Sequence, residues 1–405
     1  MAHFENNNFK SNHFNKSLYI HPYFCIMKFA IIGGGPAGLY FSILVKKWNP
    51  SIEIDLFERN APEDTFGWGV VFSDKTLSYL KAEDVPTYEA ITKRFATWDN
   101  VDIVYRDEKI TVRGNKFSGI ARIEILHILQ QRAQELGVNL HFRSPVLSLD
   151  QFHSYDLIVG ADGVMSEVRS QYEQDFKPNL STRSNKYIWF GTRHLFNGLT
   201  LTFRENGAGV FAAHSYKFDK TTSTFIVECD EETWEQAGFA DIDDDSTRNY
   251  LEQVFHLDLQ GAELLSNNSK WLNFILVRNR NWFIAQDKTP HIVLLGDSLA
   301  TVHFSIGSGT KLALEDSIAL FHALRKKNPL QDALIEFESF RRPVVEEYQE
   351  AAYESLLFFE NLKDYMHLDP LPFAYKLMTR SGKIDIENLR RRDPAFVGRY
   401  EEYSK

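Results

Sequence analysis

A glycine-rich turn close to the start of the chain constrains the fold more than any other segment. The apolar run at 28–32, KFAII, predicts a buried parallel strand. The turn after it follows the pattern G-x-G-x-x-G and contains Gly33, Gly35, Pro36, Ala37 and Gly38. Glycines at this spacing permit a tight turn and a close approach of the backbone to a pyrophosphate. Proline suits the first turn of a following helix, whose N-terminus would offer free N–H groups to the phosphates.

A second predicted strand completes a dinucleotide-binding pattern. The run at 52–57, IEIDLF, leads into Glu58 and Arg59. Glu58 comes twenty-five residues after Gly33, where an acid can accept hydrogen bonds from a ribose. The alternative is a glycine-rich turn followed by an ordinary solvated glutamate. The pattern predicts a dinucleotide site without choosing between FAD and NAD.

Two later segments have a related form. The run at 155–160, YDLIVG, leads into Asp162 and Gly163, and the run at 292–295, IVLL, leads into Gly296 and Asp297. Singly, each fits a buried strand that ends in a turn or in a helix cap. In this order, and after the glycine-rich turn, the three segments resemble the FAD-binding framework of single-component flavin hydroxylases of the p-hydroxybenzoate hydroxylase type.

The resemblance implies FAD as the cofactor, with NADPH or NADH as the electron donor. In that family, residues at the positions of Asp162 and Gly163 lie near the pyrophosphate and serve both FAD and the nicotinamide donor. The aspartate that matches Asp297 binds the ribitol chain, and the arginine that matches Arg122 reaches the FAD phosphates. The alternative for Arg122 is an ordinary surface arginine.

A second glycine-rich loop contains Gly307, Ser308, Gly309 and Thr310 and precedes a helix expected from about Leu312. Such a loop aims backbone amides and a helix dipole at one point. The resemblance implies that this point holds the N1 and O2 edge of the flavin, where negative charge accumulates on reduction. Relatives often carry prolines just before these glycines, whereas this chain carries His303 and Phe304.

The predicted fold is α/β: a Rossmann-like FAD-binding domain with an inserted β-rich substrate domain and a helical C-terminal region. Strand-like runs separated by turn residues characterise the insertion, at 187–190, 199–203, 210–213 and 223–228. We therefore expect the FAD-binding domain at 27–180 and 276–325, the β-rich substrate domain at 181–275 and the helical region at 326–405. Residues 1–26, which lack a long apolar core and a cleavage site, are expected to be a disordered extension or a miscalled start.

Composition excludes several other classes. A net charge of −10 argues against nucleic acid as a partner. No apolar stretch approaches the length that spans a bilayer, so no membrane partner is expected. The two cysteines, Cys25 and Cys229, give neither a disulfide framework nor a metal-ligand spacing, so we expect no metal and a reducing, cytoplasmic location. The aromatic content of 14% suits pockets for flat rings.

A closer resemblance rests on longer strings of sequence. The segments at 66–74, 117–122, 187–192, 303–312 and 377–394 resemble the aryl-CoA branch of the family, which includes salicylyl-CoA 5-hydroxylase and 2-aminobenzoyl-CoA monooxygenase. Those enzymes often continue into a second, old-yellow-enzyme-like domain, which this sequence does not. The tryptophan hydroxylase of violacein biosynthesis shares many of these strings and remains an alternative. An alternative of another class is a flavin reductase or FAD carrier that performs no oxygenation.

The resemblance implies that NAD(P)H reduces FAD, that O2 then forms a C4a-hydroperoxide, and that this species hydroxylates an aromatic ring. The expected partner is a small aromatic substrate, possibly linked to CoA, and the protein is expected to be a monomer or a homodimer. Candidate pocket residues are Trp68, Trp189, His214 and Tyr216. His214 and Tyr216 are two apart on a predicted strand and share a face. His303 is the candidate catalytic residue, because its near-neutral pKa suits proton transfer.

The basic clusters at 325–327, 341–342 and 390–392 fit CoA phosphates, which arginine binds through paired N–H donors. Solvated basic faces of C-terminal helices explain the same clusters equally well. The sequence therefore leaves the choice between a CoA thioester and a free amino acid open.

Overall fold

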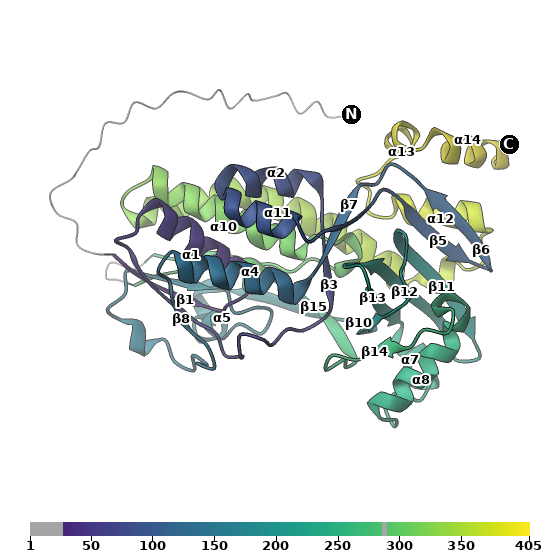
Figure 1. Ribbon diagram of the computed structural model, residues 1–405, viewed down its shortest axis with the longest axis horizontal. Coiled ribbons are helices and arrows are strands. Elements are labelled where there is room, and N and C mark those ends of the chain that lie inside the picture. The colour runs from purple at the N-terminus through teal and green to yellow at the C-terminus, as the bar shows by residue number, and fades with distance from the viewer. Residues whose placement is uncertain (1–26, 286–289) are drawn as a thin grey trace.

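Two sheets lie side by side and divide the molecule into two halves (Figure 1). The computed structural model describes residues 27–285 and 290–405. The expectation for residues 1–26 lies outside this range. The sheets and their covering helices confirm the predicted α/β fold class with its Rossmann-like portion.

The first sheet has six strands in the order β16-β17-β9-β1-β2-β8. All neighbours are parallel except β16 and β17, which are antiparallel. Residues on both faces of the central strands are buried, so their runs are hydrophobic throughout rather than alternating. The strands are β1 (Lys28–Ile32), β2 (Glu53–Phe57), β8 (Asn139–His141), β9 (Leu157–Gly160), β16 (Phe283–Ile284) and β17 (His291–Leu294).

A group of helices packs over the first sheet (Figure 1). The central helix, α1, is buried from Ala37 to Lys46 because α4 and α10 flank it. The group comprises α1 (Pro36–Trp48), α2 (Asp74–Glu83), α3 (Val85–Thr92), α4 (Arg122–Glu135), α10 (Gly309–Lys326) and α11 (Leu330–Glu360). Two short helices follow β9: α5 (Glu167–Gln171) and α6 (Glu173–Phe176).

The second sheet is largely antiparallel and has eight strands, in the order β14-β10-β13-β12-β11-β5-β6, with β15 paired to β10. One strand pair within it is parallel, that of β11 and β5. The strands are β5 (Val101–Tyr105), β6 (Glu108–Val112), β10 (Pro178–Thr192), β11 (Leu199–Asn206), β12 (Gly209–Lys217), β13 (Ser223–Cys229), β14 (Leu264–Leu265) and β15 (Leu272–Asn279).

The strands of this sheet extend a few residues beyond both ends of the predicted β-rich domain, and one further segment joins them from elsewhere in the chain. Residues 101–112, which we assigned to the first part of the FAD-binding domain, form β5 and β6 of the second sheet. Their pairing with β11 joins strands about a hundred residues apart, and spacing along the sequence does not reveal such a contact. A third sheet of three strands, β3 (Gly69–Phe72), β7 (Phe117–Ala121) and β4 (Ala96–Trp98), lies between the two halves.

Helices cover both faces of the second sheet. One core contains aromatic residues of β10, β12 and β13 with α7 (Glu231–Gln236), α8 (Asp244–Val254) and α9 (His256–Leu259). The other joins β5, β6 and β11 to α12 (Pro370–Thr379), α13 (Ile386–Arg392) and α14 (Pro394–Tyr403).

The long helix α11 reaches both halves of the molecule. Near its start, Arg341 donates to Asp316 (2.5 Å) and Glu315 (3.2 Å) of α10, and all three side chains are buried. Near its end, Phe358 and Phe359 enter the core beneath β5 and β11. The helix therefore ties the first sheet to the second.

Candidate active site

The three segments singled out in the sequence meet at the carboxyl ends of β1, β9 and β17. A Cβ at Gly33 would lie 2.2 Å from the carbonyl oxygen of Ala161, and one at Gly296 would lie 3.0 Å from the Cβ of Ala37. The hydroxyl of Ser298 donates to the carbonyl of Gly160 (2.5 Å). Ligands of open α/β sheets bind at this end of the strands, so the geometry marks a candidate cofactor site.

The first glycine-rich turn forms an open cradle. Gly33 has φ of +114°, which favours glycine, and a Cβ at Gly38 would lie 2.2 Å from the carbonyl oxygen of Gly33. At Gly35, by contrast, a Cβ would meet no protein atom within 4 Å. Gly35 is the N-cap of α1 and Pro36 occupies its first turn, so the leading amides of α1 face open space. This arrangement fits a pyrophosphate.

Glu58 lies beside this cradle. One carboxylate oxygen accepts a hydrogen bond from the backbone N–H of Gly34 (2.7 Å), and the other accepts from the backbone and side chain of Asn60 (2.9 and 2.7 Å). These donors fix the carboxylate at the end of β2, where a ribose would follow the pyrophosphate. Arg59 is exposed beside it.

Asp162 binds the start of the helix that follows it. Its carboxylate accepts from the hydroxyl of Ser166 (2.6 Å) and from the N–H of Val168 (3.2 Å) at the start of α5, and burial raises its pKa. Gly163 has φ of +84° and a Cβ there would meet no protein atom within 4 Å. The side chain of Asp162 thus holds the turn, and the backbone at Gly163 faces open space.

A cavity of about 720 Å³ lies between the two sheets. Arg122 and Asp297 line it at the end nearest the glycine-rich turn. Asp297 is exposed to this cavity; its pKa is raised by partial desolvation within the cavity, an effect that the charge of Arg122 opposes. The Nε of Arg122 is buried without a hydrogen-bond partner, and burial lowers the pKa of this guanidinium. Both groups fit a polar ligand that supplies hydroxyls and anionic oxygens.

The second glycine-rich loop also lines the cavity, through Gly307, Ser308, Gly309 and Thr310. Gly307 has φ of +61°, and α10 begins at Gly309, three residues before the expected start. The hydroxyl of Ser308 donates to the carbonyl of Ile306 (3.2 Å) and does not cap the helix. The first amides of α10 therefore remain available to a ligand in the cavity.

Three of the four predicted pocket residues line the cavity: Trp189, His214 and Tyr216. The hydroxyl of Tyr216 donates to the carbonyl of Gly69 (2.8 Å). Trp68 is not among the lining residues, because it packs beneath Gly191, where a Cβ would lie 2.8 Å from its ring.

His303 lies behind the cavity wall. It is 2% exposed and is not among the lining residues. Its Nδ1 is 2.8 Å from the hydroxyl of Ser305, and burial lowers its pKa to about 4 despite the nearby Glu228. The ring is therefore neutral at neutral pH and does not itself reach the cavity.

Glu228 connects His303 to the cavity wall. It accepts from Asn185 (2.9 Å), its other oxygen lies 3.2 Å from Nε2 of His214, and His303 Nε2 is 3.8 Å away. Burial acts to raise the pKa of Glu228, but His303, His214 and Asn185 outweigh it, so the pKa is lowered. The carboxylate is therefore ionised.

Arg380 is a cation close to Glu228 and His303. It lines the cavity and donates to the hydroxyl of Ser355 (2.8 Å) and the carbonyl of Ser305 (2.9 Å). Burial lowers its pKa to about 10, and Glu228 opposes this. Sequence reasoning missed the roles of Glu228 and Arg380. The one available signal was an acid within a strand, β13, whose residues are all buried.

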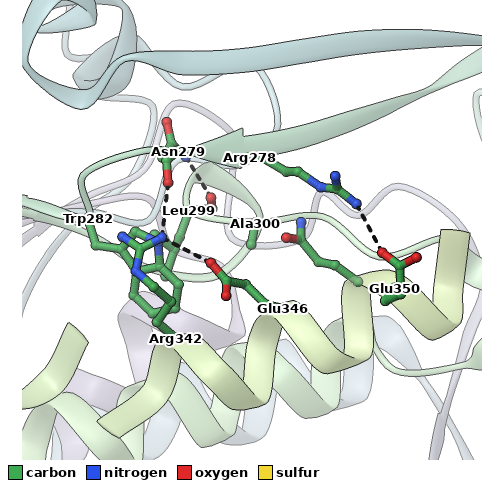
Figure 2. Close-up of a pocket in the computed structure, with 9 residues that line it drawn as sticks. Arg278, Asn279, Trp282, Leu299, Ala300, Arg342, Glu346 and Glu350 are labelled. Carbon is green, nitrogen blue, oxygen red and sulfur yellow. Dashed lines mark hydrogen bonds and ion pairs between the residues drawn. The ribbon is translucent and has the colours of Figure 1, made fainter. Parts of the chain in front are cut away.

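A smaller cavity of about 250 Å³ lies between the end of β15 and α11 (Figure 2). Its charged side chains mostly bind one another: Arg278 lies 3.9 Å from Glu350, and Arg342 lies 3.3 Å from Glu346 and stacks over Trp282. None of the glycine-rich segments lines this cavity. The larger cavity is therefore the candidate active site.

Within residues 27–285 and 290–405, no group of three or more His, Cys, Asp or Glu side chains has the arrangement of a metal site. No helix in the same ranges combines the length and the apolar character that crossing a membrane requires.

The fold and this cavity agree with comparisons to known proteins. The chain belongs to the FAD-dependent aromatic monooxygenases. It is 40% identical over 387 residues to salicyloyl-CoA 5-hydroxylase of a Streptomyces species, an alignment that covers 92% of this chain and 73% of that protein. It is 33% identical over 365 residues to protodeoxyviolaceinate monooxygenase of Chromobacterium violaceum, covering 87% and 94% of the two chains.

A third relative is 3-hydroxy-4-methyl-anthranilyl-[aryl-carrier protein] 5-monooxygenase of Streptosporangium sibiricum, 30% identical over 363 residues with 90% and 97% coverage. Among solved structures, p-nitrophenol 4-monooxygenase of Pseudomonas putida matches with a TM-score of 0.70 at 15% identity, covering 93% of this chain and 98% of that one. The oxygenase for 2-methyl-3-hydroxypyridine-5-carboxylic acid matches with a TM-score of 0.66 at 17% identity, with 91% and 98% coverage. No protein-family model matches the chain. These relatives confirm the predicted family and its monooxygenase class.

Proposed function

We propose that this protein uses NADH or NADPH and O2 to hydroxylate an aromatic ring carried as a CoA thioester, such as salicylyl-CoA or 2-aminobenzoyl-CoA. The observation that carries the proposal is the 40% identity to salicyloyl-CoA 5-hydroxylase over 92% of the chain. FAD, when bound, supplies the electron transfer and oxygen activation that side chains lack.

In this proposal the chain's own residues bind and orient the cofactor. The amides at the start of α1, around Gly35, bind the pyrophosphate, and Glu58 accepts from a ribose. Arg122 donates through its unpaired Nε to a phosphate, and Asp297 accepts from the ribitol hydroxyls. The assignments of Gly35, Arg122 and Asp297 rest on open or unpaired groups, whereas that of Glu58 rests on its position beside the turn, where its neighbours hold the carboxylate in place.

The loop at 307–310 supplies electrostatic stabilisation. Its amides and the N-terminus of α10 point to one region of the cavity, where they stabilise negative charge on the flavin ring without reorganising. Trp189, Tyr216 and Ile226, which line the same cavity, would provide a flat, apolar surface for the substrate ring and exclude water from it.

Basic side chains from the C-terminal helices support a CoA thioester. Lys383 and Arg392 are exposed and also line the cavity. Arg392 donates to Asn115 (2.8 Å), and Lys383 pairs with Glu347. Their positive charges support the binding of an extended polyanionic chain that leaves the cavity. Arg390 of the same cluster instead pairs with Glu387 and Glu401.

The test is NAD(P)H oxidation by the flavin-loaded protein, measured with salicylyl-CoA, 2-aminobenzoyl-CoA and tryptophan, with product analysis. We expect a CoA thioester to stimulate NAD(P)H consumption and to yield a hydroxylated product. If tryptophan were the one compound hydroxylated, the result would favour the alternative function, a tryptophan or indole hydroxylase. NAD(P)H consumption that yields only hydrogen peroxide with every compound would favour a flavin reductase.

A further inference from the structure

A buried histidine and a buried carboxylate form a pair in the wall of the cavity. Nε2 of His214, on β12, lies 3.2 Å from Oε2 of Glu228, on the neighbouring strand β13. His214 is 4% exposed and Glu228 is 2% exposed. His214 lines the cavity, and its Nδ1 has no hydrogen-bond partner among the described residues.

The pair fixes the position of the proton on the imidazole ring. An ionised carboxylate only accepts hydrogen bonds, so the Nε2 that faces Glu228 must carry the hydrogen. In the neutral ring the other nitrogen, Nδ1, then carries a lone pair. The carboxylate of Glu228 thus presents His214 to the cavity as an acceptor, and it would stabilise the ring if the ring gained a second proton.

We propose that His214 is a catalytic residue that accepts the proton of a hydroxyl or amino group on the substrate ring, and that Glu228 is the residue that positions it. This inference rests on the proposed function, whose named substrates carry an O–H or N–H group on the ring. The O–H or N–H bond breaks, its electron pair stays on the substituent, and the proton bonds to Nδ1. The electron-rich substituent then makes the ring a better nucleophile toward an electrophilic oxygen.

The surroundings of the ring support this role. Phe304 lies edge-on at 5.3 Å between ring centroids, and Phe359 of α11 lies at 4.7 Å, so the pair is held in an apolar setting. Three further groups face the pair: Asn185 of β10 and His303 contact Glu228, and Arg380 acts on it electrostatically. Arg380 donates to both Ser355 and Ser305, which keeps its charge fixed while His214 changes protonation.

His303 does not serve as this acceptor. Its ring does not line the cavity, and its Nδ1 faces Ser305 rather than open space. Its distance from Glu228, 3.8 Å, also exceeds that of a hydrogen bond. Of the two, only His214 combines a hydrogen bond to the carboxylate with a place among the residues that line the cavity.

The experiment compares two ligands that differ only in the donor, salicylyl-CoA and benzoyl-CoA. Binding to the flavin-loaded protein is measured by the flavin absorbance change, and the ionisation of the bound salicylyl ring by its own absorbance. The variants are His214→Phe, which removes the acceptor, and Glu228→Gln, which keeps the shape of the positioning residue. The control is His256→Gln, an exposed histidine of α9 whose ring contacts only the carbonyl of Gln253.

We expect wild type and the control to bind salicylyl-CoA more tightly than benzoyl-CoA and to ionise the phenol. In His214→Phe the two ligands should bind equally, the phenolate absorbance should vanish, and kcat for salicylyl-CoA should fall by about a hundredfold. In Glu228→Gln the acid limb of the kcat profile should move to lower pH, because the protonated ring loses its counter-charge, while benzoyl-CoA binding stays unchanged.

A flavin-loaded His214→Phe protein that still discriminates the two ligands and still ionises the phenol overturns the inference. Should Glu228→Gln fail to fold, His214→Phe decides alone. If wild type binds neither thioester, the aryl-CoA proposal fails, and the same comparison with salicylate and benzoate then decides the role of His214 separately.

Discussion

Gly33 and Ala161 lie so close that a Cβ on the glycine would be 2.2 Å from the alanine carbonyl oxygen. The two residues are 128 positions apart and belong to separate glycine-containing segments. Their contact packs the turn after β1 against the end of β9 and leaves the space over Gly35 free. The first prediction follows from this difference between two neighbouring glycines.

Gly33→Ala should destabilise the protein severely, since the methyl group meets backbone and the φ of +114° is unfavourable for alanine. Gly35→Ala should leave the stability of the flavin-free protein unchanged, because its methyl group meets no protein atom and its φ of −76° suits alanine. It should nevertheless weaken FAD binding. Thermal unfolding without FAD and flavin titration separate the two effects. Equal losses of stability in both variants would contradict the open space over Gly35.

Asp297→Ala should weaken FAD binding by about tenfold to a hundredfold, the effect of removing a charged hydrogen-bond acceptor. The carboxylate accepts no hydrogen bond from a described residue, so its loss should not destabilise the flavin-free protein. The matched control is Asp241→Ala, an exposed aspartate outside the cavity. Unchanged flavin retention in Asp297→Ala would remove this residue from the cofactor site.

The same variant should alter the pH dependence of stability. Burial raises the pKa of Asp297 in the folded protein above its value in the unfolded chain. The folded state therefore binds the proton more tightly, and wild type loses stability as the pH rises from the unfolded pKa through the folded one. Without FAD, Asp297→Ala should gain stability relative to wild type across that window. Urea unfolding at several pH values measures the difference in free energy of unfolding between variant and wild type. For the control Asp241→Ala, this difference should not increase with pH.

Lys383→Ala and Arg392→Ala should each raise KM for an active CoA thioester by about tenfold, because a charged hydrogen bond contributes about 1.5–3 kcal/mol. Their effect on kcat should be small, since both lie at the outer part of the cavity. The N-acetylcysteamine thioester of the same acid, which lacks the phosphates, should show no change. Arg391→Ala on the same helix, α13, provides the control because Arg391 does not line the cavity. Equal effects on both thioesters would contradict a role in binding phosphate.

His303 should make stability sensitive to acid. Its pKa is lowered from 6.5 to about 4 in the folded protein, so the unfolded chain binds a proton that the folded one excludes between these values. Stability is therefore retained above pH 6.5 and falls as the pH drops toward 4, by about 3 kcal/mol. His303→Asn should lose this component of the pH dependence. Urea unfolding at pH 7.5 and pH 5 tests this, with His256→Gln as the variant that should behave like wild type.

Much of the geometry of the candidate cofactor site was predictable, because its residues act through local geometry. A glycine before a helix, or an aspartate after a buried strand, occupies a defined place relative to its own element. The convergence of Gly33, Asp162 and Asp297 therefore follows from parallel strands whose carboxyl ends share one edge.

The substrate wall was less predictable because its contacts are long-range. The sequence indicates Trp68 and Trp189 equally as pocket residues, yet of the two only Trp189 lines the cavity. Trp68 instead packs against Gly191, which has no side chain in its way. The near-neutral pKa expected for His303 applies to a solvated ring, whereas this ring is buried. The link from Glu228 to His303 joins positions 75 residues apart, and no local pattern encodes it.

Helix α11 affects how the protein unfolds. It carries Arg341, which binds α10, Ser355, which binds Arg380, and Phe359, which lies under the second sheet. Melting the whole of this helix would expose apolar surface in both halves and would free the Arg341 charge from its buried partners, which is strongly destabilising. We therefore expect unfolding of one half to destabilise the other, so that neither half serves as an independent module.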